Sequence, residues 1–107
     1  MLPLANGTMA YQTGSFDATL AAAAGDDPAL RAELCLAFED SLSQQLDLLQ
    51  RARCDGNWTL AAQRLKGLAA SFHADELLAI SERVLASAPG EPRAIGEVRA
   101  FLDGFSA

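Results

Sequence analysis

The sequence predicts an all-α fold, an up-down antiparallel four-helix bundle with a short extra N-terminal helix. Stretches of the chain repeat apolar residues with helical period, and Pro, Gly, Asp or Asn residues separate these stretches. No segment alternates apolar and polar residues with the two-residue period of a strand. The breaks between the expected helices are short, which makes successive helices antiparallel neighbours.

Length and composition define one domain. A chain of 107 residues that is 50% hydrophobic favours one folded domain over disorder. We expect a flexible N-terminal segment over residues 1–14, where Pro, Asn and Gly interrupt any period, and a single helical domain over 15–107. The net charge of −6 argues against nucleic acid as a partner, because binding to phosphates needs a surplus of Lys and Arg.

No signal points to a membrane, a metal or a cofactor. The first residues lack the basic and apolar runs of a secretion signal, and no spanning run follows them, so we expect a cytoplasmic protein without membrane contact. Cys35 and Cys54 are expected to be free thiols. With His73 as the single histidine, no spacing suits a metal site.

The first two helices are expected over 15–24 and from Pro28 to about Arg53. Ser15 is expected to cap the first helix, and Asp27 to cap the second. The apolar stripe expected for the second helix comprises Leu34, Phe38, Leu42, Gln45 and Leu49, with Leu30 and Ala52 at its ends. Leu36 points away from this stripe, and we expect the N-terminal helix to cover it.

Three further helices follow. Asp55-Gly56-Asn57 is expected to form a turn in which Asn57 caps a helix over 58–73. Asp75 is expected to cap a helix that runs to about Ser87. Its periodic residues are Leu77, Leu78, Ser81, Val84 and Leu85. The segment 89–92 breaks the chain before a last helix that buries Ile95, Val98, Phe101, Leu102 and Phe105.

The helix expected over 58–73 has two unlike faces. Its apolar face comprises Trp58, Ala61, Leu65, Leu68, Ala69 and Phe72. Gln63, Lys66, Gly67 and Ala70 lie on the opposite side. A glycine inside an exposed helix costs about 1 kcal/mol relative to alanine. Either a neighbouring helix packs on Gly67, or a partner approaches the backbone there; the spacing leaves both interpretations open.

The stretch from Trp58 to Ala74, WTLAAQRLKGLAASFHA, resembles the signature of histidine-containing phosphotransfer (HPt) domains. That signature is an Ala-His pair, one free residue, Leu-Lys-Gly, small residues and then Gly-Ala. The resemblance in helix number and order extends over about 16–105, but only 58–74 carries motif identity. It implies a monomeric four-helix bundle of bacterial phosphorelays, in which an exposed histidine exchanges a phosphoryl group with receiver-domain aspartates.

The chain departs from this signature at three positions. Gln63 stands at the position of the phosphorylated histidine, Leu68 at that of a small residue, and His73 at that of a glycine. The lone pair of a carboxamide nitrogen is delocalised, so Gln63 cannot act as the nucleophile. His73 lies about 15 Å further along the helix and about 80° around it. We therefore expect no catalytic residue and no enzyme activity, with His73 as a helix-end residue bonded to a carbonyl or to solvent.

The resemblance implies a binding surface made of Leu60, Gln63, Arg64, Lys66, Gly67 and Ala70. The expected partner is the receiver domain of a response regulator or of a hybrid histidine kinase. Lys66 would contact its acidic pocket, and Gly67 would let a partner loop come close. Leu48, one helix earlier, would extend the surface.

Two other interpretations remain open. The chain could be a phosphotransfer protein whose histidine has been replaced by mutation, although the departures at Leu68 and His73 argue against a single replacement. It could also be a helical interaction module unrelated to signalling.

Overall fold

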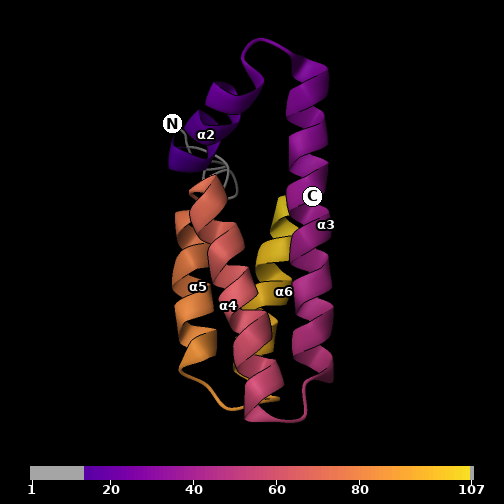
Figure 1. Ribbon diagram of the computed structural model, residues 1–107, viewed down its shortest axis with the longest axis vertical. Helices are drawn as coiled ribbons and strands as arrows, with labels where there is room; N and C mark the ends of the chain where they lie inside the picture. The colour runs from indigo at the N-terminus through magenta and orange to yellow at the C-terminus, as the bar shows by residue number, and fades with distance from the viewer. Residues whose placement is uncertain (1–13, 107) are drawn as a thin grey trace.

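The computed structural model describes residues 14–106, which form five helices and no strand (Figure 1). These are α2 (Gly14–Ala24), α3 (Pro28–Arg51), α4 (Asp55–Phe72), α5 (Asp75–Leu85) and α6 (Pro92–Ser106). The prediction of an all-α domain is confirmed for this range. The flexible segment expected over 1–14 lies outside the described residues, except for Gly14, which begins α2. No helix in the described range is long and apolar enough to cross a membrane.

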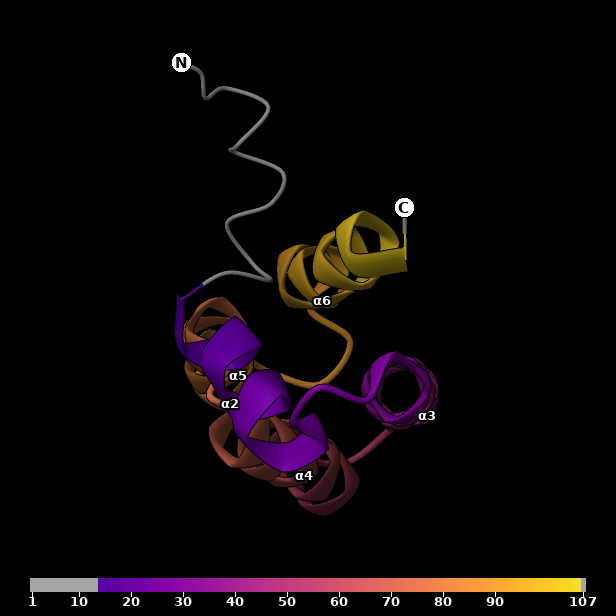
Figure 2. The ribbon, with the colours of Figure 1, turned by 90° about the horizontal axis from the view of Figure 1, so that it is seen from above.

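Four helices pack around a common core. Each of α3, α4 and α5 contacts the next helix in the chain, and α6 packs back against α3. Figure 1 shows the chain passing back and forth along the long axis of the domain through these four helices. Helix α2 contacts α3 and α4, and it lies across one end of the other helices (Figures 1 and 2). The helix contacts are consistent with a bundle.

Phenylalanines from four helices meet in the core at the end of the domain that α2 covers. Phe38 of α3 lies 4.9 Å from Phe72 of α4 and 5.1 Å from both Phe16 of α2 and Phe105 of α6, measured between ring centroids. Aromatic rings at these separations attract one another beyond the burial of their area. The cluster therefore fixes α2 to the rest of the domain.

The start of α3 follows the prediction. The prediction that the N-terminal helix covers Leu36 is wrong. Asp27 Oδ1 accepts hydrogen bonds from the backbone N–H groups of residues 29 and 30, at 3.0 and 3.2 Å, and Pro28 is the first helical residue. Leu36 is 64% exposed. Phe16 and Leu20 of α2 instead enter the core, because the aromatic cluster draws α2 onto the end of the domain.

The stripe expected on α3 is confirmed in its central residues. Phe38, Leu42 and Leu49 are buried, and Leu34 and Gln45 are half-buried. The helix ends at Arg51 rather than near Arg53, because the backbone becomes extended at residue 52.

The predicted caps of α2, α4 and α5 are wrong. Helix α2 begins at Gly14, so Ser15 lies inside its first turn. Helix α4 begins at Asp55, and Asn57 lies in its first turn rather than at its cap. Helix α5 begins at Asp75, whose Oδ2 accepts a hydrogen bond from Ser15 Oγ at 3.1 Å, while no side chain caps the helix. A contact between distant segments thus replaces two local caps.

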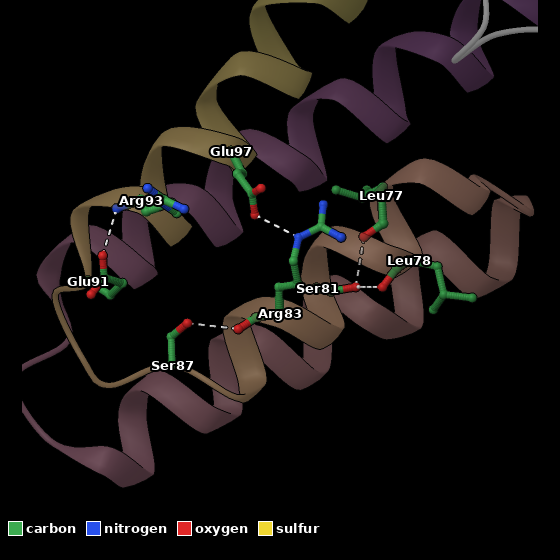
Figure 3. A network of polar contacts seen from close by, with 8 residues as sticks. All are labelled: Leu77, Leu78, Ser81, Arg83, Ser87, Glu91, Arg93 and Glu97. Atoms are coloured by element: carbon green, nitrogen blue, oxygen red, sulfur yellow. Dashed lines mark hydrogen bonds and ion pairs between the residues drawn. The ribbon is translucent and has the colours of Figure 1, made fainter.

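Figure 3 shows a network of polar contacts in α5, in α6 and between these two helices. Ser81 is fully buried, and its Oγ donates to the carbonyl oxygens of Leu77 and Leu78 at 2.8 and 2.9 Å. Arg83 Nε donates to Glu97 Oε1 at 3.0 Å.

Helix α5 ends at Leu85, two residues before the predicted end. In α6, Ile95 and Leu102 are half-buried rather than buried, while Val98, Phe101 and Phe105 are buried as predicted.

His73 ends α4 in a left-handed conformation, with φ 54° and ψ 40°. The backbone N–H groups of His73 and Ala74 donate to the carbonyl oxygens of Ala70 and Ala69, at 3.2 and 2.8 Å. These two bonds form a Schellman motif, in which glycine is the usual left-handed residue. A glycine would therefore adopt the backbone conformation of position 73 with less strain than histidine.

The imidazole of His73 bonds to a side-chain hydroxyl through Nδ1. Its Nδ1 lies 2.9 Å from Thr19 Oγ1. Thr19 Oγ1 also donates to the carbonyl oxygen of Ser15 at 2.8 Å, which favours the imidazole tautomer with its hydrogen on Nδ1. His73 thus contributes a side-chain link between α2 and the end of α4.

We predict that His73→Gly is more stable than His73→Ala by about 1 kcal/mol, because only alanine keeps a Cβ in the left-handed conformation. Both variants lose the bond to Thr19, so the comparison isolates the backbone. Urea denaturation gives the two free energies of unfolding. At position 96, inside α6, the order should reverse, with Gly96→Ala more stable than the parent. Equal stabilities for the two variants at position 73 would contradict the prediction.

Candidate functional site

The α4 face is the outward side of α4 made of Leu60, Gln63, Arg64, Lys66, Gly67 and Ala70. All of these residues are exposed except Lys66, which is half-buried. Leu60 is 49% exposed and gives the face an apolar side chain. From Leu60 to Ala70 the face extends about 15 Å along the helix. The structure therefore places the predicted site residues on one side of one helix.

Small residues set the position of α4 in the domain. Ala61, Ala62 and Ala69 are at most 1% exposed, and they lie on the inward side with Trp58 and Leu65. Because alanine carries only a methyl group, α4 packs closely against α3 and α5. Leu68 packs on the edge of this core as a half-buried residue. The larger side chain at position 68 is therefore taken up by the core and leaves the α4 face unchanged.

Gly67 has open space around it. A Cβ built on this residue meets no atom within 4 Å, apart from its neighbours in the chain and its own helix backbone. Within residues 14–106, no neighbouring helix packs on Gly67, so the packing interpretation of this glycine is wrong for that range. The glycines at positions 56 and 96 are open as well, so an open helical glycine is not by itself a binding site.

Lys66 lies on the α5 side of the α4 face and pairs with Glu82. The distance from Lys66 Nζ to Glu82 Oε2 is 3.8 Å, and both side chains are substantially exposed. Exposed ion pairs of this kind contribute less than about 1 kcal/mol. Glu82 was not among the residues predicted for this face. A hairpin of α4 and α5 about the turn at 73–74 does place residue 66 opposite residues 81 and 82, so the signal was present.

Arg64 lies on the α3 side of the face, in contact with a groove. Among the described residues, no hydrogen bond or ion pair involves its guanidinium. The α3–α4 groove has a volume of about 270 Å³. It is lined by Leu48, Ala52, Leu60 and Ala61 and by the polar side chains of Arg51, Asn57 and Arg64. The groove brings Leu48 beside Leu60 and Arg64.

The α4 face has no group suited to nucleophilic chemistry. Gln63 offers a neutral amide, and the remaining side chains are aliphatic or cationic. His73 is held at the end of α4 by Thr19, away from the centre of the face. In the described part of the chain, no cluster of three or more His, Cys, Asp or Glu side chains is placed to hold a metal ion. The arrangement can bind by shape, hydrogen bonding and positive charge.

No family model, curated protein or solved structure matches this chain.

We predict that Gly67→Ala raises the free energy of unfolding by about 0.5–1 kcal/mol, because the added methyl group meets no atom and alanine is the better helix former. Gly96→Ala is the matched control and should give a gain of similar size. Urea denaturation monitored by the fluorescence of Trp58 measures both. A loss of stability for Gly67→Ala alone would mean that the backbone at position 67 needs glycine for folding.

Proposed function

We propose that this chain is a non-catalytic HPt-like module, a pseudo-HPt, that binds receiver domains of response regulators or hybrid histidine kinases without carrying phosphate. In this proposal α3–α6 form an up-down antiparallel four-helix bundle and α2 is an extra N-terminal helix. The protein acts as a monomer in bacterial two-component signalling. It competes with an active phosphotransfer protein, sequesters a regulator or serves as an adaptor.

The combination of an open glycine with an exposed amide and an exposed leucine on the α4 face carries the proposal. Gly67 lowers the stability of α4, and nothing in the described domain uses the space that it leaves. Gln63 lies one helical turn before it, and Leu60 and Ala70 extend the same exposed surface in both directions. A partner loop can therefore approach the backbone of α4 closely beside an exposed leucine. Such an arrangement favours binding to a protein surface.

The chemistry of Gln63 supports binding without transfer. A carboxamide can donate and accept hydrogen bonds with a receiver surface. It cannot form a phosphoramidate bond, because its nitrogen lone pair is shared with the carbonyl. The positive charges of Arg64 and Lys66 flank Gln63 in a chain of net charge −6. These two positive charges are complementary to an acidic pocket on the partner.

We predict that Gly67→Glu weakens receiver binding at least tenfold, because a glutamate side chain would fill the approach path and repel an acidic pocket. Calorimetric titration against the receiver domains encoded in the same genome measures the affinity. Gly96→Glu introduces the same side chain and charge on α6 and should leave the affinity unchanged. Both sites are open, so both variants should fold, which circular dichroism checks.

Absence of binding to every receiver would overturn the proposed function. Equal affinity for the two glycine variants would show that receivers bind elsewhere, as expected for a helical module whose α4 face is not used.

We predict that Gln63→His gains phosphotransfer, because the imidazole supplies the missing nucleophile on an otherwise retained surface. Mixing the variant with a phosphorylated receiver should place an acid-labile label on this chain, and the parent should stay unlabelled. The double variant Gln63→His with Gly67→Glu is the control for docking and should lose the label. A receiver that binds the variant tightly without any transfer would mean that the face holds position 63 away from the reacting aspartate.

A further inference from the structure

The positive charge on the α4 face is distributed unequally. On the α5 side, Lys66 already faces the carboxylate of Glu82 at 3.8 Å. On the α3 side, Arg64 has no ion pair among the described residues, and Arg51 lines the same groove. Arg51 pairs with Asp47 at 3.0 Å, yet its side chain remains 67% exposed. The cation with no carboxylate of its own therefore lies at the α3–α4 groove.

The same groove has an apolar part beside its polar side chains. Leu48 and Leu60 line it from the two helices, together with the almost fully buried Ala52 and Ala61. Its volume of about 270 Å³ is just below the range of pockets that enclose cofactor-sized ligands, about 300–1,000 Å³. Apolar side chains that insert into small pockets of this kind are typical anchors of protein interfaces. The size and the lining favour a single anchoring side chain over a small molecule.

We propose that the α3–α4 groove binds an acidic segment of a protein partner that inserts a leucine-type side chain between Leu48 and Leu60 and places a carboxylate on Arg64. The inference rests on the proposed function for the identity of the partner as a receiver-bearing protein. Charge complementarity selects this occupant. Two copies of this chain would each carry a net charge of −6, so repulsion between the whole chains opposes a second copy as the occupant. A free phosphate would leave the leucines uncovered.

The test uses a peptide probe that does not depend on any receiver. The probe is acetyl-Asp-Glu-Leu-Leu-Glu-Asp-amide, titrated to millimolar concentration into the isotope-labelled chain and followed through backbone amide signals. We expect saturable shifts at residues 48, 60 and 64. Replacing both leucines of the peptide by alanine, or its acids by lysine, should weaken binding about tenfold, because one change removes the anchor and the other the charge.

Variants of the chain locate the site. Arg64→Glu should weaken binding of the acidic peptide about tenfold, and Leu60→Ala should do so to a smaller extent. Arg99→Glu, an exposed arginine of α6, is the matched control and should leave the affinity unchanged. Analytical ultracentrifugation of the free chain detects self-association, and inorganic phosphate replaces the peptide in a parallel titration.

The outcomes separate this inference from the proposed function. Receivers that bind the parent and Arg64→Glu equally, together with no peptide shifts at the groove, would overturn the inference and leave the proposed function intact. Peptide binding at the groove without any receiver binding would support the inference and overturn the proposed function. Shifts of the same residues with phosphate alone, or self-association through Leu60, would assign another occupant and overturn the inference.

Discussion

The close packing of α4 through alanines is the constraint on which the rest of the structure depends. Ala61, Ala62 and Ala69 are essentially inaccessible, so α4 packs closely on α3 and α5 along its length. Trp58 anchors its first turns, because Nε1 donates to the carbonyl oxygen of Val84 at 3.0 Å inside the core. A helix held on its inner side in this way can present glycine and other small residues outward without losing its position.

The packing of the inner side of α4 therefore determines where the exposed residues of its outer side lie. The α4 face contains a leucine, an amide and a bare stretch of backbone, and its two cations have different surroundings. Glu82 partly neutralises Lys66, whereas Arg64 points its charge toward the α3–α4 groove. The unpaired positive charge of this surface therefore increases across the helix from the α5 side to the α3 side. A partner that reads charge would be oriented by this difference.

The sequence predicted the features that depend on residues close together in the chain, such as the start of α3. Asp27 and Pro28 begin α3 as expected, because capping and a fixed φ act within a few residues. The cap assigned to Asp75 failed because Ser15, sixty residues away, donates to that carboxylate. Leu36 was misjudged because phenylalanines of four helices determine where α2 lies. Helical period places the residues of the α4 face on one side of the helix, whereas Glu82 and the groove depend on the neighbouring helices.

The open glycines also bear on how the domain can be engineered. Gly67 and Gly96 both lie in helices with room for a methyl group, so each offers a simple route to a more stable scaffold. Only one of them lies on the α4 face. Position 96 can be filled to make the helical domain more stable, whereas under the proposed function filling position 67 would gain stability and narrow the approach to the α4 face. The two glycines would then separate the demands of folding from those of recognition.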